Sequence, residues 1–596
     1  MSSVPERGDL DEAYTWDLTD LFADDEAWEA AFAEVEARVE DLEAYEGRTG
    51  EDAETLQEIL ELRETVGREV EDVYTYARLR RDEDTTDQTY QALEARARSL
   101  AADASSAASY VEPELLELGR EAVDEFVAEN PALETYDHYF DDVFRMQAHT
   151  RSAEVEELLA DLGEVTGAAA DVYNMLTNAD VQFPAVEDPE GERRRITLSN
   201  FATLQKHPDR AFRREVHEAF YDEWASYRNA IGTAYKNSVK ADSKLAAARN
   251  YETAREAALD GPNVPAEVYD TLVETVEDNL EVLHRHVELK RECLGVDELK
   301  MWDLYAPLAG GEGPDLEYDR AREYVVEAVA PLGEAYRDRM AEGLASRWVD
   351  VYETVNKQSG AYSSGTYDSQ PYILMNYQDD VASMFTLAHE LGHSMHSELT
   401  SDAQPYVYAD YEIFVAEVAS TVNEALLTHH LLEAVDDETL RRHVLDEFLE
   451  RFRSTLFRQT MFASFEHRAH ELSEGGEALT PDRLDGLYGG LKEAYYEPAD
   501  VDDRIAREWM RIPHFYRAYY VFQYATGISA ANAIVDRILT EGEDAAADYR
   551  EFLRSGSRGY PLELLEVAGI DMSTPEPVEA AIERYDDLVG EYESLR

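Results

Sequence analysis

Apolar side chains recur every three or four positions along most of the chain, which is the spacing of amphipathic helices. In the first third of the chain, this pattern forms one stripe within residues 28–42 and another within residues 56–79. It returns between residues 210 and 294, where Pro262 and Pro265 mark a turn. The pattern therefore predicts a mainly α-helical protein, with the stripes in its core.

The period of the pattern changes near the middle of the chain. Residues 348–355 alternate and are rich in β-branched side chains, and residues 371–377 form a second short apolar run, so both are predicted to be β-strands. The glycine-, serine- and tyrosine-rich stretch between them, residues 357–365, is predicted to be a loop. An edge strand here can hold an extended peptide by main-chain hydrogen bonds.

The helix predicted next carries a candidate metal site. His389 and His393 are four positions apart, so their side chains share one face of a helix and can both reach one zinc ion. Glu390 follows His389 directly, so its side chain points one helical position away from the face of the two histidines. There it is placed to hold a metal-bound water molecule rather than to bind the metal, which completes the H-E-x-x-H signature. Asp379 or Asp380 can cap the helix. An ordinary amphipathic helix with two hydrogen-bonded histidines is the alternative that the five-residue pattern leaves open.

A catalytic zinc ion needs a third protein ligand. In one common pattern, a histidine stands six residues after the second motif histidine, but here that position is Leu399. His396 lies one turn further along the same helix and is expected to pack behind the ligands, because three successive turns cannot easily close around one ion. Glu417 and Glu424 share one face of an apolar downstream helix, where unpaired burial is costly. We therefore predict Glu417 as the ligand and Glu424 as a partner that orients a histidine; solvated glutamates are the alternative.

Charge narrows the classes of partner. The 596 residues include 54 Lys and Arg but 129 Asp and Glu, so the formal net charge is −75. Such a surface lacks the basic footprint of a nucleic-acid-binding protein, and it disfavours anionic membranes. There are only 8 lysines against 46 arginines. Because high salt screens the self-repulsion of such a chain, we expect a halophile-type proteome.

Cys293 is the single cysteine, so no intramolecular disulfide can form and no zinc site built from two or more cysteines is possible. The N-terminus lacks the basic and apolar regions of a signal peptide. No run approaches the ~20 apolar residues of a membrane span. These features predict a cytoplasmic protein.

Five separated blocks of the sequence resemble the oligoendopeptidase F branch of the thimet oligopeptidase family. They are residues 359–363, 372–377, 389–396, 414–420 and 513–527. The resemblance implies one zinc ion per chain, bound by His389, His393 and Glu417. It also implies that Glu390 is the general base that activates a zinc-bound water.

The same resemblance implies a two-lobed helical ellipsoid with a deep channel that admits short unstructured peptides, and a small β-sheet beside the helix pair. We divide the chain accordingly into an N-terminal helical region, a helical lobe with a hairpin and a catalytic domain, which span residues 1–115, 116–200 and 201–596. In that family a histidine and tyrosines of a late segment meet the substrate. In the late segment of this chain, the matching positions are His514, Tyr519, Tyr520 and Tyr524. Gly360 and Tyr362, in the block 359–363, are further candidates for substrate contact.

The predicted function is zinc-dependent hydrolysis of internal bonds in short peptides, with His514 or Tyr519 donating a hydrogen bond to the oxyanion. One alternative is a metallocarboxypeptidase, in which Arg511 and Arg517 would receive the terminal carboxylate. Another is a non-catalytic peptide-binding protein. Peptides blocked at both ends distinguish the first two, because only an endopeptidase cuts them internally. The pattern does not set the oligomeric state.

Overall fold

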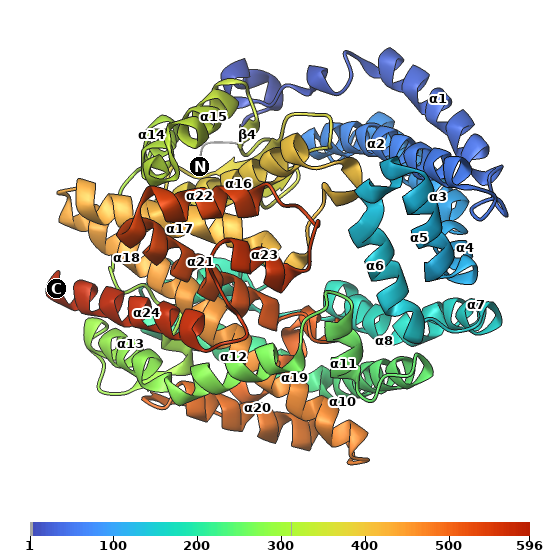
Figure 1. Ribbon diagram of the computed structural model, residues 1–596. Helices are drawn as coiled ribbons and strands as arrows, with labels where there is room; N and C mark the ends of the chain where they lie inside the picture. The colour runs from blue at the N-terminus through green and yellow to red at the C-terminus, as the bar shows by residue number, and fades with distance from the viewer. Residues whose placement is uncertain (1–3, 312) are drawn as a thin grey trace. The chain divides into compact units, whose positions relative to one another are not determined.

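The computed structural model describes residues 4–311 and 313–596, and most of them are helical (Figure 1). The predicted fold class, mainly α with small sheets, is confirmed. The chain forms two compact units, each assembled from three stretches of sequence. The first unit comprises the residues up to Gln147, Asp315–Leu431 and Ile534–Gly569, and the second comprises Ala148–Pro314, Leu432–Ala533 and Ile570–Arg596.

The first unit consists of helices around one three-stranded sheet. Its helices are α1 Asp25–Glu43, α2 Ala53–Glu83, α3 Gln88–Ala108, α4 Val111–Leu118, α5 Arg120–Glu129, α6 Asp137–Arg145, α14 Tyr318–Ala328, α15 Glu334–Ala345, α16 Val381–Ala403, α17 Ile413–Ala434 up to Leu431, α22 Glu543–Leu553 and α23 Pro561–Val567. The helices α1, α2 and α3 pack against one another (Figure 1). Their apolar stripes form a buried core, as predicted, although Phe32 and Leu62 remain half-buried.

Aspartates begin several of these helices. The side chains of Asp24, Asp52 and Asp380 each accept a hydrogen bond from a backbone N–H in the first turn of α1, α2 and α16. Such caps satisfy donors that have no partner within the helix. The acidic composition therefore contributes to helix formation as well as to surface charge.

The sheet of the first unit contains β4 Val349–Tyr352, β6 Tyr372–Tyr377 and β5 Tyr362–Ser364, in that order. The strands β4 and β6 are the two predicted ones and pair in parallel, whereas β5 pairs antiparallel with β6. The prediction of a loop over residues 357–365 was therefore wrong for its last part, which forms an edge strand. The serines and glycines of this stretch have low β propensity and hid the strand, which is stabilised by its pairing with β6.

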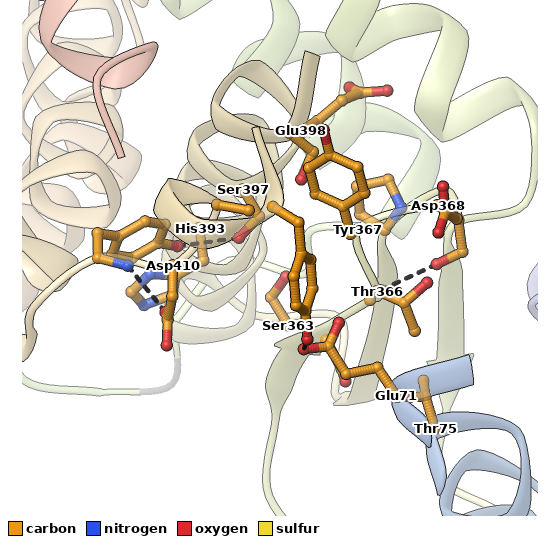
Figure 2. A pocket seen from close by; sticks show the side chains of 18 of the residues that line it. Glu71, Thr75, Ser363, Thr366, Tyr367, Asp368, His393, Ser397, Glu398 and Asp410 are labelled. Carbon is orange, nitrogen blue, oxygen red and sulfur yellow. Dashed lines mark hydrogen bonds between the residues drawn. The ribbon is translucent and has the colours of Figure 1, made fainter. Parts of the chain in front are cut away.

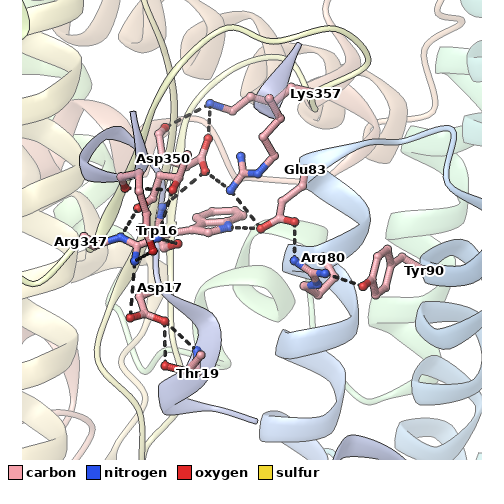
Figure 3. Close-up of polar contacts among 12 residues, drawn as sticks. Trp16, Asp17, Thr19, Arg80, Glu83, Tyr90, Arg347, Asp350 and Lys357 are labelled. Carbon is pink, nitrogen blue, oxygen red and sulfur yellow. Dashed lines mark hydrogen bonds and ion pairs between the residues drawn. The ribbon is translucent and has the colours of Figure 1, made fainter. Parts of the chain in front are cut away.

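A buried polar network anchors the N-terminal segment to this sheet (Figure 3). Asp350 on β4 forms ion pairs with Lys357 (2.7 Å) and Arg7 (2.6 Å). Lys357 also donates to three main-chain carbonyls near the ends of β4 and β6. Glu83 at the end of α2 accepts from the indole N–H of Trp16 at 2.8 Å. These contacts fix the start of the stretch that leads into β5.

The second unit is also helical. Its helices are α7 Ala153–Asp161, α8 Gly163–Met175, α9 Phe201–Gln205, α10 Arg210–Ala248, α11 Ala254–Asp260, α12 Ala266–Asp278, α13 Leu280–Cys293, α18 Glu438–Phe452, α19 Arg458–Glu474, α20 Pro481–Tyr495, α21 Phe522–Glu541 up to Ala533 and α24 Glu576–Ser594. Two pairs of short strands accompany them: β1 Ala185–Glu187 with β2 Arg193–Arg195, and β3 Leu299–Lys300 with β7 Ala499–Asp500. Over the part of the chain that the structure describes, no helix is both long and apolar enough to cross a bilayer.

Candidate metal centre

Three side chains of the first unit converge on one point between α16 and α17. His389 and His393 lie one turn apart on α16, and Glu417 extends towards them from α17. The Nε2 atoms of the two histidines are 3.2 Å apart, and they lie 3.4 and 3.6 Å from the Oε2 atom of Glu417. This is the group of potential metal ligands that the described residues form.

The spacing of these three atoms fits a tetrahedral zinc ion. Ligand atoms held at ~2.0–2.1 Å from zinc in tetrahedral geometry are about 3.3 Å from one another. The observed separations of 3.2 to 3.6 Å are close to that value. Two imidazoles and one carboxylate are also the donor set of many catalytic zinc sites, which leave a fourth position open.

Gly392 allows α17 to approach α16 closely enough for this convergence. A Cβ atom at position 392 would lie 2.5 Å from the Cα of Ser420 and 2.6 Å from the carbonyl oxygen of Ala419. Real Cβ atoms do not come so close to a neighbouring backbone. Across the same interface, the side-chain amide of Asn423 donates to the carbonyl of Ala388 (3.1 Å). A glycine in the middle of a helix is the sequence signal that marks this close contact.

Two further contacts orient the ligands. The Nδ1 atom of His389 lies 2.7 Å from a carboxylate oxygen of Glu424, so the proton sits on Nδ1 and Nε2 is free to bind a metal. Burial alone would lower the pKa of His389, but the hydrogen bond and charge of Glu424, together with the other carboxylates, raise it. The hydroxyl of Ser420 donates to Glu417 Oε2 at 3.0 Å.

Glu390 is buried beside the ligands, with 7% of its surface exposed. Burial raises its pKa to about 7, although the charge of His389 acts in the opposite direction. The backbone N–H of Ser363 on β5 donates to its carboxylate, and the Ser363 and Ser394 hydroxyls are 2.8 Å apart. The edge strand that the sequence did not reveal therefore holds this glutamate in position.

The two remaining histidines of the motif helix differ in their surroundings. Burial, together with the charge of His389, lowers the pKa of His393 to about 4, so its imidazole is neutral and has a lone pair to offer. His396 is not part of the ligand group that the described residues form. Its ring stacks on Tyr411, with the ring centres 3.8 Å apart, and burial lowers its pKa to about 3.

The ligand group opens into a cavity of about 1280 Å³ that is lined entirely by residues of the first unit. Figure 2 shows His393 and Ser397 on one side of this space and Glu71 on another. Tyr362 on β5 also lines the cavity. Gly360 precedes this strand with a φ of +91°, and its carbonyl accepts a hydrogen bond from Asn376. The lining is mostly polar.

The other predicted substrate residues belong to the second unit. The rings of His514, Tyr520 and Tyr524 form a half-buried cluster, with centres 5.4 to 6.0 Å apart. Tyr519 instead points into the unit: its hydroxyl lies 3.2 Å from His467 and its backbone N–H donates to Glu466. The approach of any of these side chains to the metal ligands stays a prediction.

Comparisons with known proteins agree on one family. The sequence profile described as Peptidase family M3 matches residues 203–584, and the profile described as Oligopeptidase F matches residues 114–183. Oligopeptidase PepF of Bacillus subtilis is 42% identical over 100% of this chain and 89% of its own length. Group B oligopeptidase PepB of Streptococcus agalactiae is 40% identical over 99% and 98% of the two chains. The solved oligoendopeptidase-F of Enterococcus faecium matches with a TM-score of 0.74 and 35% identity, over 96% of this chain and 99% of that one.

Proposed function

This chain belongs to peptidase family M3, and from that premise we propose that it is a zinc-dependent oligoendopeptidase of short, unstructured peptides. Its full-length similarity to oligoendopeptidase F proteins makes it a metalloendopeptidase. The observation that carries the finer proposal is the tetrahedral spacing of His389, His393 and Glu417 next to the buried carboxylate of Glu390. Bound to these three side chains, a zinc ion would polarise the scissile carbonyl and acidify a water molecule.

Glu390 is the general base of this proposal. Its pKa of about 7 lies near the pH at which the enzyme would work, which suits a group that both accepts and returns a proton. Its carboxylate takes a proton from the attacking water and delivers it to the leaving amine. The N–H of Ser363 keeps the carboxylate in one orientation throughout.

The strand β5 is the proposed docking edge for the substrate. It pairs with β6 on one side only, and Ser363 at its centre contacts Glu390. An extended peptide that adds to the other side would run past the general base, held by its main chain with little demand on its side chains. Broad sequence tolerance is the expected consequence.

The cluster of His514, Tyr520 and Tyr524 is the proposed source of oxyanion donors, by resemblance to the family. Its members share one half-buried surface, whereas the Tyr519 hydroxyl is engaged by His467. Burial, followed by the charges of Arg517 and Arg458, lowers the pKa of His514, so it is neutral and can donate one hydrogen bond at pH 7.

The experiment that tests this function is cleavage of an internally quenched peptide of about ten residues in high salt, before and after chelation and after addition of zinc. Internal cuts that disappear with the chelator and return with zinc are expected. Release of single C-terminal residues would instead support a carboxypeptidase. For that reading Arg517 remains the available cation, since Arg511 is engaged by Glu508 and Tyr305. Zinc binding without any cleavage would leave a peptide-binding protein.

The second part of the proposal is that the chain requires high salt to stay folded. A net charge of −75 over 596 residues produces strong self-repulsion, which mobile ions screen. We expect dialysis into dilute buffer to unfold the chain, as measured by circular dichroism. A fold and an activity that both survive in dilute buffer would contradict the halophile assignment but leave the peptidase assignment intact.

A further inference from the structure

A buried group in the second unit places three cations around one carboxylate. Glu508, on the short 3-10 helix Ile505–Arg511, accepts hydrogen bonds from Arg458 (2.7 Å) and Arg511 (2.8 Å) through one oxygen. Its other oxygen contacts Lys492 (2.6 Å) and the hydroxyl of Tyr488 (2.7 Å). We call Arg458, Lys492, Glu508 and Arg511 the Glu508 cluster.

The Glu508 cluster carries more positive than negative charge. Burial alone would raise the pKa of Glu508, but the charges of Lys492, Arg458 and Arg511 hold it well below its usual range, so it is ionised. Among the residues that the structure describes, none of the three cations forms an ion pair with another carboxylate. Three cations and one carboxylate leave two positive charges without a carboxylate partner among the described residues, inside a chain whose net charge is −75.

A neighbouring carboxylate, Glu450, is already paired with two other cations. Glu450 on α18 uses one oxygen for Lys290 (2.6 Å) and the other for Arg453 (2.8 Å). Arg453 neighbours the Glu508 cluster through two tyrosines: its guanidinium is 5.6 Å from the ring centre of Tyr305 and 3.3 Å from the hydroxyl of Tyr496. This neighbouring group pairs one carboxylate with two cations, so it offers no spare negative charge to the Glu508 cluster.

Two buried donors next to the cluster have no partner among the described residues. They are the Nε–H of Arg511 and the hydroxyl of Tyr221, whose side chain is 1% exposed. Both pack against the ring of Phe201: the Arg511 guanidinium is 5.5 Å and the Tyr221 ring 5.8 Å from its centre. The Tyr305 ring also neighbours Phe201, at 6.2 Å, and its hydroxyl accepts a hydrogen bond from Arg511 at 3.0 Å. Buried donors of this kind are costly unless something accepts from them.

We propose that a monovalent inorganic anion of the size of chloride binds in the second unit beside Arg511, accepting hydrogen bonds from Arg511 Nε and the Tyr221 hydroxyl. Such an anion supplies the missing negative charge and satisfies both donors at once. The burial of Tyr221 selects against a peptide carboxylate, which would have to bring a chain into the interior. All residues of this site belong to the second unit, whereas the metal ligands belong to the first.

Anion binding would also stabilise the segment that carries His514. Arg511 stands three residues before His514, and the turn Pro513–Tyr516 follows the 3-10 helix directly. With the anion bound, Arg511 would be held by Glu508 on one side and by the anion on the other. This would reduce the mobility of the residues that begin the turn. We therefore expect halide ions to raise turnover at constant ionic strength, as well as thermal stability.

The direct test is crystallography of the full chain with bromide in place of chloride. An anomalous difference peak within hydrogen-bonding distance of Arg511 Nε and the Tyr221 hydroxyl is expected. An ordered water molecule at that place without an anomalous signal, at molar bromide, would overturn the proposal. This test needs no variant and no activity.

A solution test uses thermal unfolding at fixed potassium concentration and ionic strength, with gluconate replaced stepwise by chloride. The midpoint should rise and saturate, and Tyr221→Phe should weaken chloride binding about tenfold, the usual effect of losing one hydrogen bond to a charged group. Tyr235→Phe is the matched control, because Tyr235 is equally buried and its hydroxyl also has no partner, but its charged neighbours are carboxylates. This control should keep the chloride response of the wild type.

Three results would overturn the proposal even if Tyr221→Phe fails to fold. One is a wild-type midpoint that does not depend on chloride. A second is stabilisation by acetate but not by bromide, which would identify a carboxylate site. The third is a phenolate absorbance in the ultraviolet spectrum at neutral pH that disappears in Tyr305→Phe. Such a result would mean that the ionised Tyr305, and not a bound anion, neutralises the cluster.

Discussion

The metal centre of the first unit and the Glu508 cluster of the second unit present opposite versions of one problem. At the metal centre, three carboxylates surround two histidines within a few ångströms; they are Glu390, Glu417 and Glu424. In the Glu508 cluster, three cations surround one carboxylate. Each site buries charge of one sign beyond what its own side chains neutralise, and such charge is costly without a partner.

The two sites differ in where their polar atoms point. At the metal centre, three ligand atoms face one another at 3.2 to 3.6 Å, which is the spacing of donor atoms around one metal cation. In the Glu508 cluster, the cations point at Glu508 itself, and Arg511 Nε and the nearby Tyr221 hydroxyl are buried donors without a partner among the described residues. Excess negative charge at the metal centre therefore indicates a cationic ligand, and excess positive charge in the Glu508 cluster indicates an anionic one. The number of side-chain atoms that converge on each ligand indicates how tightly that ligand is bound.

The largest effect is expected at the general base. Glu390→Gln should lower kcat by about 10²–10⁴-fold, the usual contribution of a general base, while zinc content stays near one per chain. Quenched-peptide kinetics and metal analysis measure the two quantities. Glu398→Gln is the control, because Glu398 lines the same cavity but pairs with Arg339. Near-wild-type turnover of Glu390→Gln would refute the assignment.

The Glu508 cluster should respond through stability instead. Glu508→Gln leaves three buried cations together and should lower the free energy of unfolding by about 3–5 kcal/mol. Added chloride should restore part of this loss, because the excess positive charge has grown. Lys492→Met, which removes one of the surplus cations, should cost less and should weaken the response to chloride. Equal responses of the two variants would show that charge does not govern the cluster.

A substitution of Glu424 tests whether a carboxylate that does not itself bind the metal still affects zinc affinity. Because it holds the Nδ1 proton of His389, Glu424→Gln should weaken zinc binding about 10–100-fold, measured by competition with a chelator. The thermal midpoint in the absence of zinc should change little by comparison. Unchanged zinc affinity would mean that the contact is purely structural.

Gly392 tests the backbone contact beneath the metal centre. Gly392→Ala must push α17 away from α16, so we expect a loss of about 1–3 kcal/mol in stability and weaker zinc binding. Gly486→Ala on α20 is the matched control, since a Cβ there would meet nothing within 4 Å and should stabilise the helix by up to ~1 kcal/mol. Chemical denaturation of both variants gives the comparison. A neutral Gly392→Ala would contradict the close approach of the two helices.

The sequence by itself determined the features that depend on neighbouring positions. Four-residue spacing places His389 and His393 on one face, and an aspartate caps their helix. Alternation marks β4, a short apolar run marks β6, and the apolar stripes mark the buried faces of α1 and α2. These patterns are readable because helices and strands repeat every few residues, so the chemistry of a segment reports its local structure.

Only the tertiary structure decided which distant residues meet. Ser363 reaches Glu390 through an edge strand that its own stretch of sequence did not indicate, because β5 depends on its pairing with β6. Arg511, which the sequence offered as a receptor for a peptide carboxylate, instead pairs with Glu508 and Tyr305. Periodicity carries no information about contacts between segments that are far apart in the chain. The fit of the metal ligands and the excess charge of the Glu508 cluster therefore appear only when packing brings these segments together.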